Sequence, residues 1–355
     1  MKRSTITRCA PRQAFASALV LGTLIAASPV AVADEGGVSF WIPGFFGSLA
    51  ATPQQPGFSF ATMYYHTSVS AGADVAFARQ VSRGRLTTNF NANLNLNLNA
   101  DVDLGIAIPQ YVFATPFLGG QASVLLLVPY GHGTATVDGT LTASLGPFGF
   151  TVGGSRTDQV WGFGDLVPQF NVRWNDGVHN WMTYITGNAT VGAYDQARLV
   201  NLGIGHNALD GGGGYTYFNP QTGNEFSAVL GFTYNFENEH TQYQNGVDMH
   251  LDWATSKFVT KQLQLGIVGY AYKQLSCDSG SGDRVGCFES QVFGIGPQIG
   301  YVIPMGELQG YVNLKGYKEF EAKNRPEGWN VWLTFAISPA PPTPEAPKPK
   351  PRITK

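Results

Sequence analysis

The sequence is poor in charge and lacks long apolar runs. Charged residues make up 13% of its 355 positions, about half the share that is usual in soluble proteins. Beyond residue 33 the longest uninterrupted apolar run is 124–128, whereas a membrane-spanning helix needs about 20 apolar residues. The sequence therefore predicts no transmembrane helix, and its low charge is also untypical of a soluble surface.

Cysteine, histidine and basic clusters are scarce as well. Cys277 and Cys287 flank the stretch DSGSGDRVG, and two thiols without a nearby histidine predict a disulfide and no metal site. The remaining histidines show no spacing typical of metal ligands, and no cofactor is predicted. The formal net charge is −2 without a basic stripe, so we expect no nucleic-acid partner.

The N-terminus has the features of an export signal. Lys2, Arg3 and Arg8 precede a short apolar stretch that is rich in small residues, and an Ala-Val-Ala motif ends at Ala33. This order is typical of a secretory signal peptide. We expect residues 1–33 to be removed after Ala33, which places the mature chain outside the cytoplasm.

The sequence is rich in stretches in which apolar and polar residues alternate. The stretch NFNANLNLNLNADVDLGIAI at 89–108 carries an apolar residue at every even position from Phe90 to Ile108 and mostly Asn or Asp between them. A period of two predicts a strand with one apolar face and one polar face. Either a soluble sheet on a core or a barrel with lipid outside and a polar lumen fits this pattern.

The length of this stretch predicts a hairpin. Nineteen residues at ~3.3 Å each would span about 60 Å, far more than a barrel strand needs to cross a bilayer. A turn at 99–101 would keep Leu98 and Val102 on one face. We therefore expect two strands here, with the leucines facing lipid and the asparagines facing the lumen.

Similar alternation predicts an all-β fold, a transmembrane antiparallel β-barrel of about 12 strands at 57–338. Single-chain bacterial barrels have an even number of strands. If 239–260 forms a strand pair instead of a short helix on the periplasmic side, the barrel has 14 strands. The expected strands are 57–68, 84–98, 102–116, 120–137, 139–153, 158–175, 179–194, 225–238, 261–276, 287–303, 307–320 and 329–338.

The turns predict an orientation. Tight turns at 99–101, 137–139, 175–177 and 304–306 fall on the side of both termini, which we expect to be periplasmic. The longer stretches fall on the opposite, external side: 69–83, 195–224, 277–286 and 321–328.

Residues 34–56 are predicted to form a hatch or plug before the first strand. The segment is aromatic but interrupted by Pro and Gly, which is incompatible with a plain strand, and the barrel lumen is the nearest cover for it. Trp41, Phe45 and Phe46 either seal the lumen or also contact apolar cargo by stacking, and Pro43 and Gly44 are the expected hinge.

The C-terminal part carries two further signals. The last strand, EGWNVWLTFAI, alternates apolar and polar residues and resembles the terminal strand read by the barrel-insertion machinery, although it does not end the chain. Residues 339–355 contain seven prolines and are expected to form an extended, disordered periplasmic tail. Outer-membrane lipid is the expected surrounding partner, and the sequence carries no signal for an oligomeric state.

Several blocks resemble one known family. GVSFWIPGFFGSLAA, GFGDL at 162–166, the block at 211–254 and GIGPQIGY at 294–301 resemble the outer-membrane family associated with the meta-pathway of phenol degradation. That family is similar to the long-chain fatty-acid transporter barrels. The resemblance implies a channel with an N-terminal hatch, which admits small hydrophobic, often aromatic, compounds and is linked to their catabolism. We expect no enzymatic activity, and we expect passive transport because the sequence shows no energy source.

Two other functions stay open. One is a general or structural outer-membrane barrel without specific cargo. The other is a lipid hydrolase at the rim, because His66 and Ser68 lie two apart on one strand face and could form a base–nucleophile pair. The motif from Gly203 to Ala208 resembles a dinucleotide loop, but Asp210 and four glycines follow at once, so no helix can begin and we discard it.

Overall fold

The computed structural model describes residues 39–72, 92–145, 148–283 and 286–341, and this part is all-β. The predicted signal peptide, most of the predicted tail and residues 73–91 lie outside it. The strands are β1 (Gly57–Ala71), β2 (Ala92–Val112), β3 (Gln121–Leu145), β4 (Phe148–Phe163), β5 (Val167–Asp176), β6 (His179–Gly187), β7 (Ala208–Asn219), β8 (Asn224–Asn235), β9 (Asp248–Phe258), β10 (Leu263–Gln274), β11 (Gln291–Met305), β12 (Leu308–Lys323) and β13 (Glu327–Pro339).

Twelve of these strands close into an antiparallel barrel, as the sequence predicted. Neighbours in the chain are neighbours in the ring, and β1 closes it by pairing with β13. β3 pairs with β5 through residues 121–127 and with β4 through 130–145. β4 and β5 thus occupy the same place in the ring beside β3, one after the other, and residues 164–166 separate them.

The wall of the barrel follows the expected alternation. On β8 the side chains of Phe226, Leu230 and Phe232 are exposed, whereas Thr233 and Asn235 are buried toward the interior. Exposed large apolar side chains recur in this way on most strands. A continuous apolar belt of this kind requires lipid rather than water around it. Within the described residues no helix is long and apolar enough to cross a membrane.

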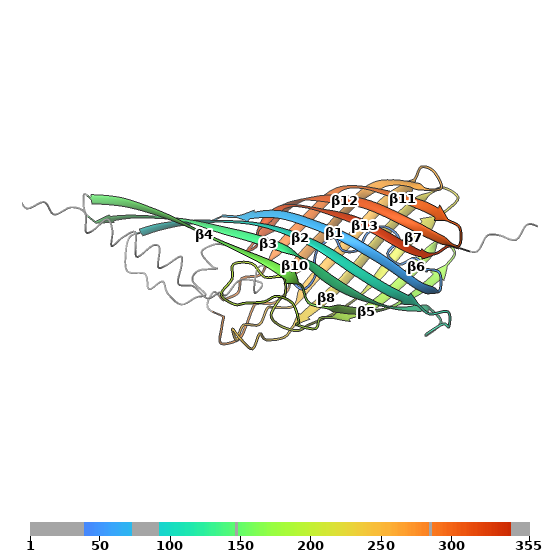
Figure 1. Ribbon diagram of the computed structural model, residues 1–355, viewed down its shortest axis with the longest axis horizontal. Coiled ribbons are helices and arrows are strands. Elements are labelled where there is room, and N and C mark those ends of the chain that lie inside the picture. Colours follow the sequence, from blue (N-terminus) through green and yellow to red (C-terminus); the bar gives the residue numbers. More distant parts are fainter. Residues whose placement is uncertain (1–38, 73–91, 146–147, 284–285, 342–355) are drawn as a thin grey trace, which may run out of the picture.

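The two ends of the barrel differ in their connections. Two to four residues join β5 to β6, β7 to β8, β9 to β10 and β11 to β12, all at the end where β1 begins and β13 finishes. At the other end lie the longer loops 188–207, 236–247 and 275–290. Figure 1 shows β2, β3 and β4 projecting well beyond the other strands at this second end.

Two of the predicted hairpins are wrong. β2 runs without a turn through 99–101, and β3 runs without a turn through 137–139. The prediction assumed that a strand only needs to cross the bilayer. These strands instead continue in a sheet that projects beyond the barrel, here called the extension (residues 92–104, 131–145 and 148–162). Strand β1 still pairs with residues 98–104, and only β2, β3 and β4 form the outer part.

The orientation predicted for the leucines of β2 is also wrong. Leu96 and Leu98 are buried, whereas Asn95 and Asn97 are exposed. The apolar face of the extension points inward, where it packs on Leu199 and Val200 of the loop 188–207. Its polar face forms the outer surface, so this part of the sheet follows the soluble pattern rather than the membrane pattern.

Two strands were missed, and they compensate for the two false hairpins in the total of twelve. β7 lies within the predicted loop 195–224, and β9 lies within 239–260. β7 contains four consecutive glycines, which have low strand propensity, but it is hydrogen-bonded on both sides, to β6 and β8. Because β7 adds a crossing, the loop 236–247 falls at the long-loop end rather than on the predicted periplasmic side.

Candidate functional site

The described N-terminal residues 39–56, here called the inner segment, lie inside the ring of strands. Their hydrogen-bond partners come from around the whole barrel, since Gln121 is on β3, Glu225 on β8 and Lys315 on β12. All three partner side chains point inward from their strands. The segment therefore lies across the lumen.

A buried pair of opposite charges holds one turn of this segment. Asp252 on β9 accepts hydrogen bonds from the backbone N–H groups of Gly44 (2.8 Å) and Phe46 (3.0 Å). The Lys315 ammonium group on β12 donates to the carbonyl oxygens of Gly44, Phe45 and Phe46. Hydrogen bonds to charged groups are the strong ones in a low-dielectric interior. We call Asp252 and Lys315 the clamp.

Gly44 is the residue that this arrangement requires. Its φ of +87° is disfavoured for residues with a side chain. A Cβ atom there would also lie 3.0 Å from the ring of Tyr317. Both backbone polar groups of Gly44 are held by the clamp, so the segment is fixed from this residue onward.

Further contacts anchor the segment beyond the clamp. The backbone N–H of Leu49 donates to Glu225 and to Ser227, and that of Ala51 donates to Thr216. Ser48 adds a hydroxyl hydrogen bond to Glu225 (2.8 Å). Residues 44–51 are thus tied to β7, β8, β9 and β12 by polar contacts.

Residues 39–43 are held differently. Trp41 is 5% exposed and stacks face to face on His250 of β9, with 3.9 Å between ring centroids and 12° between planes. Phe45, Phe46 and Tyr184 surround the indole at 5.3–6.0 Å. Packing of aromatic rings, rather than hydrogen bonding to the barrel, therefore positions Trp41.

A cavity with a volume of about 170 Å³ lies between the inner segment and the extension. Trp41, Ile42 and Pro43 line it from the inner segment. Its other lining residues include Leu98, Ala100, Val102 and Leu104 of β2, Ala135 of β3, and Leu199, Val200 and Leu202 of the loop 188–207. The apolar face whose orientation was mispredicted thus lines this cavity.

A polar group closes part of the cavity wall. Tyr270 donates to Glu319 (2.7 Å), and Asn330 donates to the hydroxyl oxygen of Tyr270 (2.9 Å). All three residues border the cavity. The site therefore combines a wide apolar surface with a few fixed polar groups, which is the usual composition of a small-molecule site.

One aspartate at the strand interruption organises the loop 188–207. Asp165 accepts hydrogen bonds from the backbone N–H groups of Gly192 and Ile204 and from the Asn188 amide. The discarded Gly203–Ala208 motif lies here and runs directly into β7. Burial lowers the pKa of His206 in the same loop, against the opposing effect of a hydrogen bond to Asn235.

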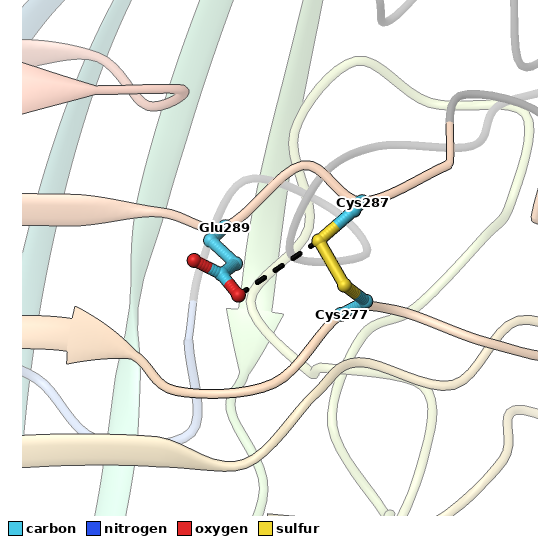
Figure 2. Close-up of side chains that lie close together, drawn as sticks. All are labelled: Cys277, Cys287 and Glu289. Carbon is cyan, nitrogen blue, oxygen red and sulfur yellow. Dashed lines mark hydrogen bonds between the residues drawn. A yellow bond between two sulfur atoms is a disulfide. The ribbon is translucent and has the colours of Figure 1, made fainter.

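The predicted disulfide between Cys277 and Cys287 is present (Figure 2). Glu289 lies 3.8 Å from the Cys287 sulfur, but disulfide sulfurs carry no thiolate, so these three residues do not form a metal site. The adjacent Asp278 accepts hydrogen bonds from Tyr243 and the Gly246 N–H, and burial raises its pKa. These contacts join the loops 236–247 and 275–290.

The structure places a carboxylate beside His66, which forms the rim pair of the hydrolase hypothesis with Ser68. His66 lies 2.8 Å from Asp103 of β2 through Nδ1, and Tyr64 donates to the same carboxylate. Ser68 shares the outward face of β1 with His66. Within the described residues, no hydrogen bond joins the Ser68 hydroxyl to the imidazole.

The hatch role of the aromatic residues of the inner segment stays a prediction, and their polar supports were missed. Asp252 was missed because β9 was not predicted. Lys315 lies in a predicted strand, where it shares inward parity with Asn313 and Glu319. A charged residue at an inward position of a low-charge barrel was a signal for a lumenal contact.

Comparison with known proteins agrees with this fold. The chain resembles the COG4313 outer membrane channel from Pseudomonas putida F1, with a TM-score of 0.55 and 13% sequence identity over 83% of this chain and 98% of the other. A Pseudomonas aeruginosa FadL homologue gives a TM-score of 0.34 at 10% identity, covering 87% and 98% of the two chains. The first similarity shows a shared barrel fold. The second TM-score is too low to show one.

Sequence comparison gives the family. Among curated proteins none matches the chain. The family described as the putative MetA-pathway of phenol degradation matches residues 58–335, which is well over half of the chain and nearly the whole barrel. The protein therefore belongs to this family of outer-membrane-type β-barrels.

Proposed function

We propose that this protein is a passive channel for small hydrophobic, chiefly aromatic, compounds in the outer membrane of a Gram-negative bacterium. The exposed apolar belt supports a membrane position, and the family name supports a link to the catabolism of such compounds. On this proposal the signal peptide is cleaved after Ala33, and the barrel-insertion machinery recognises β13.

The observation that carries the proposal is the cavity between the extension and the inner segment. Apolar solutes cross the polar outer leaflet slowly. The apolar inner face of the extension, which begins outside the membrane, offers them a route. The inward leucines of β2 provide this surface down to Trp41 and Pro43. These leucines pack on Leu199 and Val200, and the cavity that this apolar surface lines supports a binding role.

Passage then requires movement of the inner segment. The polar contacts hold residues 44–51, whereas residues 39–43 rest on aromatic packing. The boundary between these two parts lies at Pro43 and Gly44, which supports the proposal that these residues act as a hinge. We propose that residues 39–43 turn about this boundary and open the cavity toward the lower lumen.

Uptake of an aromatic hydrocarbon tests the proposal. Proteoliposomes carrying Trp41→Ala, or a variant that lacks residues 38–48, should differ from the wild-type protein in toluene uptake while the barrel keeps its heat-modifiable gel mobility. Trp329→Ala is the matched control, since Trp329 faces outward and its removal should leave uptake unchanged. Unchanged uptake in both inner-segment variants rejects the gating role.

A general pore without specific cargo is the first rival. It predicts a wide, steady ion conductance in planar bilayers that is independent of apolar solutes. Our proposal predicts a low conductance for the wild-type protein, because the inner segment crosses the lumen.

A rim-located lipid hydrolase is the second candidate, and the Asp103–His66 contact favours it. Such a carboxylate orients an imidazole for general-base catalysis on a hydroxyl nucleophile. Phospholipid hydrolysis by the purified protein that disappears in Ser68→Ala would establish this activity. An activity that is absent, or that survives in Ser68→Ala, removes the candidate.

A further inference from the structure

We propose that the indole ring of Trp41 occupies a binding site for an aromatic ring that carries a hydrogen-bond donor, such as a phenol. The inference rests on the proposed function and adds a second site below the cavity. Trp41 acts there as an internal occupant that the cargo displaces. The site, here called the ring box, is formed by Phe45, Phe46, Tyr184 and His250.

The ring box has the shape of an aromatic binding site. His250 provides a flat face on which Trp41 stacks at 3.9 Å. Phe45 meets the indole edge-on at 85°, and Phe46 and Tyr184 lie tilted beside it. Four rings that surround a fifth in stacked and edge-on geometries favour any flat aromatic ring of similar size.

The box also contains polar atoms that the indole leaves unsatisfied. His250 and Asp210 are each 1% exposed, and the imidazole Nε2 lies 2.8 Å from Asp210 Oδ2. Thr233 donates to that same oxygen. Asp210 Oδ1 and His250 Nδ1 have no hydrogen-bond partner in the part of the chain that the structure describes, and neither has the Trp41 indole N–H.

These orphaned atoms define what the ligand must carry. A neutral imidazole that donates from Nε2 to a carboxylate presents Nδ1 as an acceptor, and Asp210 Oδ1 is an acceptor as well. Both lie at the edge of the imidazole or beyond it, so an indole stacked flat on its face does not reach them. A smaller ring with a hydroxyl group can turn and donate to one of them, which relieves the cost of a buried unpaired group.

The backbone of β8 behind the ring box leaves space for the side chains of Tyr184 and His250. Gly231 of β8 lies directly behind the two ring residues, and a Cβ atom there would collide with the Tyr184 hydroxyl and the His250 ring. Gly231 therefore allows both side chains to lie flat against the wall. An alanine at position 231 would place a methyl group where the Tyr184 and His250 side chains lie and would disrupt the ring box.

The position of Trp41 allows it to leave. It borders both the ring box and the cavity of about 170 Å³, so the indole has space beside it to move away from His250. The residues that follow it stay in place because the clamp holds Gly44 and Phe46. Exchange of indole for cargo thus moves one side chain and a short stretch of backbone.

Selectivity follows from the same atoms. p-Cresol and toluene differ only in a hydroxyl group, so only p-cresol satisfies an orphaned acceptor. Benzoate has an acceptor carboxylate in place of a donor, and it would meet the Asp210 carboxylate. Sites that hydrogen-bond a hydroxyl discriminate strongly against an analogue that lacks it. We therefore expect p-cresol to bind at least tenfold more tightly than toluene, and benzoate not to bind.

The test uses the purified full-length protein in detergent. Calorimetric titration of Trp41→Ala, in which the box is open, should give this tenfold preference for p-cresol. The double variant Trp41→Ala/His250→Phe keeps a ring but loses Nδ1 and the partner of Asp210, and it should lose most of the preference. Trp181→Ala removes an outward tryptophan and should bind like the wild-type protein.

An engineered hole would also bind small rings, so the wild-type protein supplies the decisive readout. In protein labelled with 5-fluorotryptophan, the resonance of Trp41 is the one that disappears in Trp41→Phe. Saturating p-cresol should shift this resonance, and toluene at the same concentration should shift it less. A Trp41 resonance that p-cresol leaves unchanged, or equal binding of p-cresol and toluene by Trp41→Ala, overturns the inference.

The two proposals fail separately. If p-cresol displaces Trp41 but proteoliposomes show no uptake, the ring box stands and the transport function does not. If uptake depends on Trp41 but the hydroxyl group makes no difference, transport stands and the ring box is only an apolar seal.

Discussion

Strand β8 of the barrel body and the outer part of β2 use the same alternating pattern in opposite orientations, and the inward apolar face of β2 continues into the body at Ile106 and Ile108. On β8, in the body, Phe226 and Leu230 face outward and Thr233 faces inward. On the outer part of β2, Asn95 and Asn97 face outward and Leu98 faces inward. A period of two sets which residues share a face, but the medium on each side decides which face points where.

The largest effect should come from a charge on the outward face of the body. Leu230→Arg places a guanidinium group in the apolar belt, at a cost of about 2–4 kcal/mol near the bilayer midplane. Folding into lipid vesicles, followed by heat-modifiable gel mobility, should be severely reduced. Asn97→Arg, in the extension, should fold like the wild-type protein. Equal defects in the two variants would contradict the reversed orientation.

The next effect concerns the polar lumen of the body. Lys315→Met removes three hydrogen bonds to the inner segment, and a hydrogen bond to a charged group contributes about 1.5–3 kcal/mol. The segment should loosen, which planar-bilayer recording would detect as a rise in ion conductance. Lys318→Met, at an outward position of β12, is the control and should leave the conductance low.

A smaller effect is expected from a polar group on the inner face of the extension. Leu98 is 1% exposed and lines the cavity. Leu98→Asn buries an amide without a designed partner, which costs about 1–3 kcal/mol, and should weaken toluene binding measured by calorimetry. Asn97→Leu changes the exposed neighbour and should leave toluene affinity unaltered. If Asn97→Leu weakened toluene binding and Leu98→Asn did not, the leucine face would point outward.

The smallest effect is a pH response of the loop 188–207. Burial lowers the pKa of His206 below its ordinary value of 6.5. The neutral imidazole therefore stabilises the folded loop above pH 6.5, and this contribution is lost as the pH falls through the lowered pKa. Protection factors for hydrogen exchange in this loop, corrected for the intrinsic pH dependence of exchange, should be lower at pH 5 than at pH 7.5, and His206→Gln should reduce the difference. The same pH dependence in His206→Gln would assign the response to another group.

The sequence predicted the features that depend on local chemistry. Trp41, Phe45 and Phe46 need cover because they are apolar and precede the first strand, and they pack in one cluster with Tyr184 and Val229. Their role as a hatch stays a prediction. Cys277 and Cys287 pair because an oxidising compartment and a short flexible loop favour it. The tight turn at Gly177 follows an Asp-Gly signal.

The sequence could not predict features that depend on distant partners. The length of β2 was misinterpreted because nothing local shows that β3 and β4 continue beside it outside the membrane. β7 was missed because its glycines give no strand signal, although Tyr184 and Leu230 on neighbouring strands occupy the space they leave. The clamp needs residues more than 200 positions apart in sequence.

The central claim is that apolar aromatic compounds lodge between the inner face of the extension and Trp41. Crystals grown with 4-bromotoluene test it directly, because bromine is located by anomalous diffraction. We predict a bromine peak inside the barrel, within contact distance of Leu104 and Trp41. Bromine found only on the outward, lipid-facing surface, with the cavity unoccupied, would contradict the account.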